Sequence, residues 1–177
     1  MSSQYDLRGF GAAADAPVIT SLEQLADDLL CVLDQMSTEK TQIIGTSRGG
    51  SVAQVFALRN PSRTYSIAIL ASLTEDMLAM LDRAEAAEER SMEASVSPTL
   101  QHWLLPDTIA SNSWMVRYAR TCVRRTKVGN WAVAWRALAA LDINEGMRSL
   151  QVLALDVGGK QDISTPPVTA RMVADLP

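Results

Sequence analysis

Hydrophobic residues follow two kinds of pattern in the first seventy or so positions of the chain, a helical spacing and short unbroken runs. Across residues 21–36 the apolar positions recur at steps of three and four, which predicts an amphipathic helix with Ser21 as its N-cap. Residues 41–44 and 66–71 are short apolar runs and predict buried strands, and residues 49–59 between them have a helical pattern. Strand, helix and strand in this order, with short connections, predict an α/β fold with a mostly parallel sheet.

The pattern changes between residues 74 and 148, where the sequence is helical in character and rich in Ala, Met, Glu and Arg. A last strand is expected at residues 150–157, followed by the turn sequence GGKQD and a helix that begins near Pro166. We therefore expect residues 1–73 and 149–177 to form two parts of one sheet-containing core, and residues 74–148 to form a helical insertion, or cap. The cap holds all four tryptophans of the chain, Trp103, Trp114, Trp131 and Trp135.

Composition and charge exclude several function classes. Of the 177 residues, 47% are hydrophobic, and the formal net charge of −4 gives no electrostatic reason to expect nucleic acid or an anionic membrane as a partner. No apolar run approaches the roughly 18 residues that span a bilayer, and the N-terminus lacks the pattern of a signal peptide, so a cytoplasmic location is expected. Cys31 and Cys122 are far apart in apolar helical contexts, which predicts reduced core thiols rather than a disulfide.

The segment Gly45-Thr46-Ser47-Arg48-Gly49 matches the pattern G-x-S-x-G between a predicted strand and a predicted helix. A serine on such a sharp turn has its hydroxyl exposed, and the start of the following helix favours developing negative charge. Ser47 is therefore a candidate nucleophile, and the backbone N–H of Arg48 is the natural oxyanion donor. The glycine cluster lacks both G-x-G-x-x-G and the lysine of a P-loop, so a nucleotide-binding protein is disfavoured. No cofactor and no metal are predicted.

Several segments together resemble the α/β-hydrolase family. They are YDLRGFG at residues 5–11, the helix LADDLLCVLD, the G-x-S-x-G turn, and the D-x-S/T-P-P pattern at residues 162–167. Within the cap, PTLQHWLLPD at residues 98–107 and NWAVAWRALAALDI at residues 130–143 resemble 3-oxoadipate enol-lactonases and related esterases. The resemblance implies a partial α/β-hydrolase fold, with flanking helices and a helical cap. In one departure, alanines follow Gly11 where the family has serine.

The resemblance also implies the partners that Ser47 would need. Asp162 stands where the family has its catalytic acid, although it could instead only cap the turn ahead of Pro166, and Asp156 is an alternative acid. The family order is serine, acid and histidine, yet no histidine follows Asp162. Both ends look cut relative to the family, which would leave the strand at residues 41–44 at an exposed edge that allows self-association. The single histidine, His102, is interpreted as a residue that packs on Trp103 or lines the mouth of a pocket, with the role of general base as the alternative.

Two functional hypotheses follow. The first is a serine hydrolase that acts on a small carboxylic ester or lactone through an acyl-enzyme on Ser47, with a pocket shaped by His102, Trp103, Trp131 and Trp135. The second is a truncated or degenerate hydrolase scaffold without a complete triad, inactive or acting as a binding module. Four cap arginines are candidates for holding a substrate carboxylate, although a solvated helix face is the simpler interpretation of each: Arg117, Arg120, Arg124 and Arg136.

Overall fold

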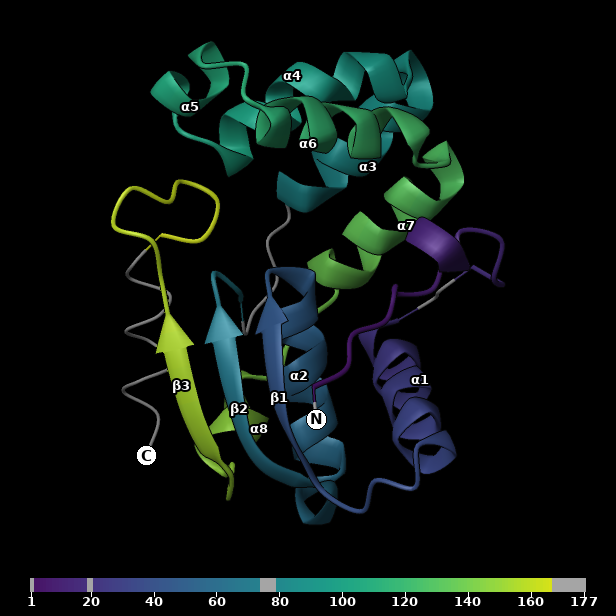
Figure 1. Cartoon of the computed structure of the whole chain (residues 1–177), viewed down its shortest axis with the longest axis vertical. Coiled ribbons are helices and arrows are strands. Elements are labelled where there is room, and N and C mark those ends of the chain that lie inside the picture. The colour runs from purple at the N-terminus through teal and green to yellow at the C-terminus, as the bar shows by residue number, and fades with distance from the viewer. Residues whose placement is uncertain (1, 19–20, 74–78, 167–177) are drawn as a thin grey trace. The chain divides into compact units, whose positions relative to one another are not determined.

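The computed structural model describes residues 2–18, 21–73 and 79–166 (Figure 1). By its internal contacts the chain divides into two compact units. One, which we call the helical unit, consists of Met1–Thr20 and Leu78–Ala139. The other, which we call the sheet unit, consists of Ser21–Met77 and Ala140–Pro177.

The sheet unit contains a three-stranded parallel sheet in the order β1-β2-β3. The strands are β1 (Thr41–Thr46), β2 (Thr64–Leu70) and β3 (Leu153–Val157). The parallel sheet predicted from the sequence is thus confirmed, although β2 begins two residues earlier than expected and β3 begins three residues later. Because all three strands run in the same direction, their carboxyl ends lie at one edge of the sheet (Figure 1).

Two of the helices in the sheet unit were predicted, and both are confirmed. Helix α1 (Leu22–Gln35) begins after Ser21, whose Oγ accepts a hydrogen bond of 3.3 Å from the backbone N–H of Gln24. Helix α2 (Arg48–Arg59) begins directly after the turn that ends β1 and packs against β1 and β2. A short helix, α8 (Asn144–Arg148), precedes β3. The core between the sheet and these helices consists of Ala53, Ala57, Ile67, Ile69 and Met147.

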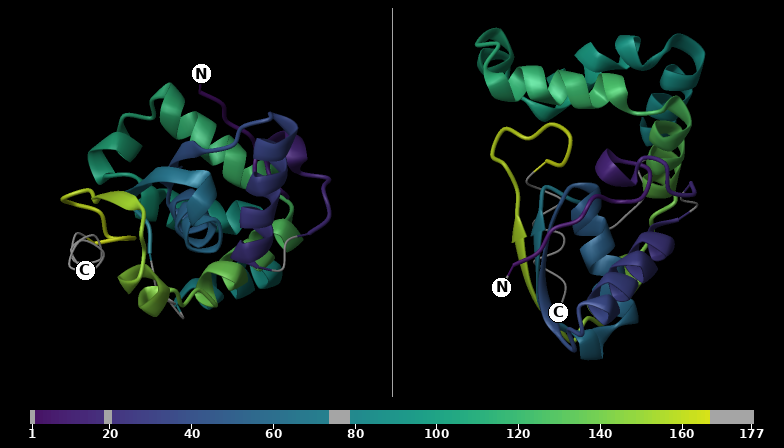
Figure 2. Two further views of the ribbon diagram at one scale, coloured as in Figure 1. Left: turned by 90° about the horizontal axis from the view of Figure 1, so that it is seen from below. Right: turned by 45° about the vertical axis from the view of Figure 1, so that its right-hand side comes forward.

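Only one face of the sheet is covered in the described part of the sheet unit, and Figure 2 shows α1 and α2 on the same side of the strands. Ile67 and Ile69 point toward α2 and are buried, whereas Ile44, Leu153 and Leu155 are 75%, 80% and 61% exposed on the opposite face. The sequence predicted that β1 and β2 are buried strands, and for β1 this prediction is wrong. An apolar run without alternation indicates burial on both faces, but α2 is the only described helix that packs extensively on the strands.

The helical unit contains five α-helices and the short 3-10 helix Gly11–Ala13 in its described part, which agrees with the helical character predicted for residues 74–148. Its buried cluster joins α4, α6 and α7 around Val96, Leu100, Val116 and Trp131. The division by contacts groups residues 1–20 with these helices and residues 140–148 with the strands. The five helices are α3 (Ala79–Arg90), α4 (Met92–Trp103), α5 (Pro106–Ala110), α6 (Trp114–Arg125) and α7 (Val128–Ala139).

The segment at residues 5–11 is fastened inside the helical unit. Asp6 Oδ2 accepts a hydrogen bond of 2.8 Å from the backbone N–H of Ala12. Gly11 has φ +51°, and a Cβ there would overlap the Asp6 carboxyl group, so a glycine is required. From α7, Asn130 Nδ2 donates a hydrogen bond of 2.8 Å to the carbonyl oxygen of Gly9. This buried amide joins the start of the chain to a helix more than a hundred residues later.

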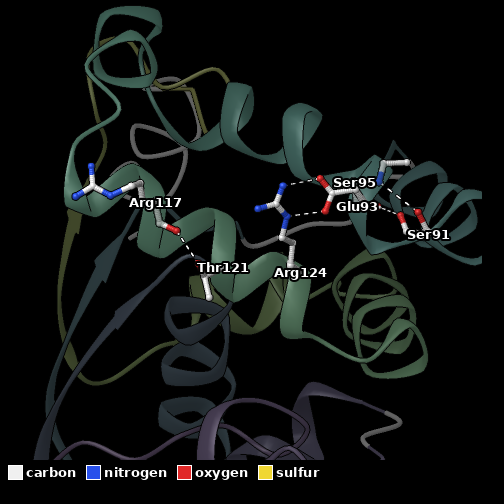
Figure 3. Close-up of polar contacts among 7 residues, drawn as sticks. Ser91, Glu93, Ser95, Arg117, Thr121 and Arg124 are labelled. Atoms are coloured by element: carbon white, nitrogen blue, oxygen red, sulfur yellow. Dashed lines mark hydrogen bonds and ion pairs between the residues drawn. The ribbon is translucent and has the colours of Figure 1, made fainter.

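Ion pairs on the surface connect the helices of this unit (Figure 3). Arg124 on α6 donates two hydrogen bonds, of 2.5 Å and 2.6 Å, to the two carboxylate oxygens of Glu93 on α4. Arg136 on α7 makes the same kind of paired contact with Glu88 on α3. Such two-point contacts fix the geometry of the helices even where solvent screening keeps their energy small.

Both cysteines are exposed free thiols rather than the core thiols that the sequence predicted. Cys31 lies on α1 on the opposite side of the helix from the buried Leu22 and Leu33. Cys122 lies on α6 beside the buried Val123 but not on the buried side. In both places the cysteine lies on the solvent-facing side of an amphipathic helix, and the other side of that helix contributes apolar residues to the core.

Candidate active site

Ser47 occupies the sharp turn between β1 and α2, with φ 52° and ψ −123°. A positive φ is rare for a residue with a side chain, and here it is held by backbone hydrogen bonds. The Ser47 N–H donates to the carbonyl oxygen of Leu70 at 2.8 Å, and the Ser47 carbonyl accepts from the N–H groups of Gly50 and Ser51. Ser47 itself is exposed. A strained, exposed serine between a strand and a helix has the geometry of a nucleophile elbow.

Two glycines make this turn possible, and only one of them belongs to the five-residue motif. A Cβ on Gly45 would overlap the carbonyl oxygen of Gly49, and a Cβ on Gly50 would lie 2.6 Å from Ser72 Cβ. At Gly49, by contrast, a Cβ would meet nothing within 4 Å in this structure. The close approach of strand and helix therefore depends on Gly45 and Gly50. The five-residue motif ends at Gly49 and does not include Gly50. The sequence signal for Gly50 was its place in the doublet Gly49-Gly50.

A buried group of polar side chains lies behind the turn. Ser72 Oγ donates a hydrogen bond of 2.7 Å to the carbonyl oxygen of Ser47, and the Ser51 hydroxyl lies 3.0 Å from the Ser72 hydroxyl. Gln54 Nε2 adds a hydrogen bond of 3.1 Å to the carbonyl oxygen of Leu73. Sequence reasoning missed this group, because no local pattern relates α2 to the residues that follow β2. It ties the elbow to the end of the neighbouring strand.

Arg48 is the first residue of α2, where backbone N–H groups have no acceptor within the helix. The first turn of a helix also carries partial positive charge, so it favours an oxyanion near Ser47. Burial lowers the pKa of the Arg48 guanidinium to about 10. The side chain therefore stays protonated at neutral pH and adds positive charge beside the turn.

Asp162 lies in the loop that follows β3, and both of its carboxylate oxygens accept hydrogen bonds from that loop. Oδ1 accepts from the backbone N–H groups of Ser164 and Thr165 at 2.8 Å and 2.9 Å, and Oδ2 accepts from Thr165 Oγ1 at 2.7 Å. These contacts hold the carboxylate in one orientation within the loop. They also match the turn-capping interpretation that the sequence left open. Pro167 and the helix expected to start beside it lie outside the described residues.

Ser47 and Asp162 follow the carboxyl ends of β1 and β3, with β2 between them. Neighbouring strands are about 4.8 Å apart, so the two outer strands are separated by roughly 10 Å. The elbow and the Asp162 loop therefore both leave the sheet at the same edge.

Asp156, the alternative acid, lies within β3 rather than in the loop. It is paired in register with the buried Ile69, close to the end of the strand, as expected for a charge that is costly to bury. Its Oδ2 atom is buried and has no hydrogen-bond partner among the described residues. Burial raises the pKa of this carboxyl above its ordinary value. An acid in this position faces the sheet core.

The remaining candidate residues all belong to the helical unit. His102 Nδ1 lies 3.0 Å from the carbonyl oxygen of Pro98 on the same helix, α4. Trp131 is buried in the core of the unit, with ring centroids 6.4 Å from Trp103 and 5.5 Å from Trp135. Trp131 is packed in this core, although its buried Nε1 has no hydrogen-bond partner among the described residues, whereas Trp103 is partly exposed. The structure thus brings Ser47, Arg48 and Asp162 together in one unit and places His102 and the tryptophans in the other.

The four cap arginines also lie in the helical unit, and their contacts differ. Arg124 and Arg136 are paired with glutamates, as described above. Arg117 Nη1 donates to the carbonyl oxygen of Asn112 at 2.6 Å, and Arg120 Nη1 donates to the Asn112 side-chain oxygen at 3.1 Å. Two of the four arginines, Arg124 and Arg136, are therefore already paired with a carboxylate.

Two other kinds of site have no candidate in the described part of the chain. Across residues 2–18, 21–73 and 79–166, no three His, Cys, Asp or Glu side chains are grouped as metal ligands would be. Within the same residues, no helix has the length and apolarity needed to cross a membrane.

Comparison with known proteins gives a consistent result. Residues 4–177 match the family model described as alpha/beta hydrolase fold. The chain is 31% identical over 169 residues to 3-oxoadipate enol-lactonase 1 of Acinetobacter baylyi, a match that covers 93% of this chain and 61% of that protein. It is 25% identical to 3-oxoadipate enol-lactonase 2 of the same organism, covering 97% of this chain and 62% of that protein. The chain therefore spans about three fifths of the length of these relatives.

Solved structures show the same fold. An enol-lactonase from Burkholderia xenovorans superposes with a TM-score of 0.91 at 24% identity, over 97% of this chain and 67% of that one. A thermophilic esterase from Thermogutta terrifontis superposes with a TM-score of 0.85 at 22% identity, over 96% and 65% of the two chains. The elbow at Ser47, the parallel sheet and the family match over residues 4–177 lead to one conclusion. This chain belongs to the alpha/beta hydrolase fold family.

Proposed function

We propose that this chain carries the nucleophile of a serine hydrolase that acts on small carboxylic esters or lactones. The observation that carries the proposal is the backbone of Ser47, which has φ 52° and ψ −123° between β1 and α2. A serine in this conformation, between a strand and a helix, is how a nucleophile elbow presents its hydroxyl, and Ser47 is exposed. The names of the relatives, enol-lactonase and esterase, support the substrate class.

The chemistry begins with attack of Ser47 Oγ on the carbonyl carbon of the substrate, while the hydroxyl proton passes to a general base. The negative charge that develops on the carbonyl oxygen is stabilised by the N–H groups at the start of α2, with Arg48 as the first donor. Collapse of the intermediate expels the alkoxide, which takes up the proton from the base. In a lactone this alkoxide stays attached to the acyl group. Water then releases the acid from Ser47.

In this proposal Asp162 holds and orients the general base. It follows β3 in the same unit as Ser47, with β2 as the strand between β1 and β3. The contacts from Ser164 and Thr165 keep the carboxylate fixed, as an orienting acid requires. His102 is the single histidine of the sequence, and its Nδ1 already contacts the Pro98 carbonyl.

That contact of His102 favours a second candidate function, in which the chain keeps the hydrolase scaffold without a complete triad. In a triad the acid engages Nδ1 of the histidine, and here Nδ1 is engaged within α4. Such a chain would bind small molecules or act only with a base supplied from outside. The two functions differ in whether Ser47 reacts as a nucleophile without added base.

Labelling with a fluorophosphonate probe, read by intact-protein mass spectrometry, separates these functions. The wild-type chain, Ser47→Ala and Ser62→Ala are compared, because Ser62 is an exposed serine away from the elbow. Hydrolysis of p-nitrophenyl acetate is measured on the same samples. Each assay is repeated with added imidazole, after subtraction of the reaction of imidazole alone.

Labelling and turnover that are lost only in Ser47→Ala would support the hydrolase, and His102→Ala would then test the base. Activity that depends on both Ser47 and added imidazole would mean that the elbow is competent and the base is absent. A folded chain that is not labelled under either condition would contradict the proposal and leave the second function.

A further inference from the structure

The helical unit contains a cavity of about 540 Å³ between α4, α5 and α6. This volume lies within the range of small-molecule sites in proteins, which is roughly 300–1,000 Å³. Every residue that lines the cavity belongs to the helical unit, so the cavity is a property of that unit alone. Most of the wall is apolar and consists of Val96, Leu100, Leu104, Pro106, Ile109 and Ala110.

The floor of the cavity is part of a packed core. Val96 and Leu100 are only 5% and 3% exposed, and they belong to the same buried cluster as Val116. Leu104 and Ile109 pack against this cluster from the side of α5. Because the floor is anchored in this way, the cavity does not require a rearrangement of the core to accept an apolar group.

Arg120 is the only charged residue among those that line the cavity. One of its N–H groups donates to Asn112 Oδ1, which holds the guanidinium in place while its other donors stay available to a ligand. Glu93 is close enough for the charge of Arg120 to help lower its pKa, but both oxygens of Glu93 are already bound by Arg124 (Figure 3). The carboxylate of Glu93 is thus occupied by Arg124, and the Arg120 guanidinium stays beside the cavity, hydrogen-bonded to Asn112.

We propose that this cavity binds a small monocarboxylate with an unbranched apolar chain, the carboxylate on Arg120 and the chain along Leu100 and Ile109. A single guanidinium matches one carboxylate through two parallel hydrogen bonds. The apolar wall accepts the chain and offers little to a highly charged anion such as phosphate. Ser97 and Gln101 supply further polar contacts at the lining. This site is independent of the proposed hydrolase function and does not require Ser47.

The test is a titration of the full chain with octanoate, kept below the concentration at which octanoate forms micelles. Binding is measured by calorimetry and by the shifts of amide NMR signals. Saturable binding is expected, with shifts at Leu100, Ile109 and Arg120. Affinity should rise about fourfold for each methylene added from butanoate to octanoate, as expected for burial of the chain. Octan-1-ol, which lacks the charge, should bind more weakly.

Three variants make the test specific. Arg120→Gln should weaken octanoate binding about tenfold or more, because a charge-assisted contact is lost. Arg125→Gln removes an exposed arginine of the same helix that does not line the cavity, and should leave binding unchanged. Ala110→Phe places a large side chain in the cavity from an exposed position and should abolish octanoate binding.

The proposal is overturned if octanoate does not bind saturably, or if Arg120→Gln and Arg125→Gln bind it equally well. It is also overturned if binding is lost in Ser47→Ala but kept in Arg120→Gln, since the ligand would then occupy the elbow. Octanoate binding that is unchanged in a Ser47→Ala protein without esterase activity would keep this proposal separate from the function proposed for Ser47.

Discussion

Ser72 Oγ donates a hydrogen bond of 2.7 Å to the backbone carbonyl oxygen of Ser47. The same carbonyl accepts the N–H of Gly50 at 2.8 Å, so the strained peptide is held from two directions. Ser72 is itself buried beside Ser51. The elbow is therefore fixed by a residue that follows the neighbouring strand and lies outside its own motif.

Removal of this hydroxyl should destabilise the fold. Ser72→Ala leaves the hydroxyl of Ser51 without its nearest partner, and we expect a loss of about 1–2 kcal/mol in the free energy of unfolding. Ser62→Ala, at an exposed site, should change it by less than about 0.5 kcal/mol. Urea denaturation of the three proteins measures both values. Equal midpoints for Ser72→Ala and wild type would show that the hydrogen bond does not stabilise the elbow.

The glycines of the elbow should differ sharply in their tolerance of alanine. Gly45→Ala would bring a methyl group into the backbone of Gly49, and we expect a loss of more than about 3 kcal/mol or no folded protein. Gly49→Ala meets open space on a helix and should be neutral or stabilising by up to about 1 kcal/mol. Thermal unfolding followed by circular dichroism compares the two. Similar losses in both variants would contradict this account of the turn.

Ionisation of Asp156 should lower the free energy of unfolding as the pH rises through the acidic range. Burial raises its pKa above the ordinary value of 3.8, so the folded state binds this proton more tightly than the unfolded state does. Stability from this group is therefore present below pH 3.8 and is lost as pH rises through the raised pKa. Asp156→Asn removes this dependence and should raise the unfolding midpoint at neutral pH.

Unfolding midpoints of wild type and Asp156→Asn, measured from pH 3 to pH 7, check this prediction. The difference between them should grow with pH and then level off above the raised pKa. A difference that is constant over the whole range would mean that ionisation of Asp156 has no part in it.

The open face of the sheet should promote self-association. Ile44, Leu153 and Leu155 form an exposed apolar surface on parallel strands. Leu155→Thr keeps a residue suited to a strand while removing apolar area, and should lower the fraction of aggregates seen by sedimentation velocity. Leu105→Thr, at an exposed leucine of the helical unit, is the matched control and should have no such effect. A monomeric wild-type chain at all concentrations would refute the prediction.

Local patterns in the sequence were enough to define the main elements and the position of the elbow. The three-and-four spacing at α1 reflects burial of one helix face, and the β-branched run at β1 reflects the strand preference of its residues; a short window of sequence records both. The same holds for the G-x-S-x-G turn, since the strand before Ser47 and the helix after it are both local. For this reason the parallel sheet and the sharp turn at Ser47 could be predicted from the amino-acid sequence alone.

Which surfaces are buried and what supports the site depend instead on how distant segments pack. Ser72 and Gly50 support the elbow through segments that the fold brings together, and no periodicity records such pairings. The contacts of Asp162, by contrast, are made to Ser164 and Thr165 in its own loop, as the turn-capping interpretation expected. Cys31 and Leu155 lie in apolar stretches of the sequence and are nevertheless exposed, for the same reason. An apolar pattern says that a residue favours burial, but whether anything covers it depends on the elements packed around it.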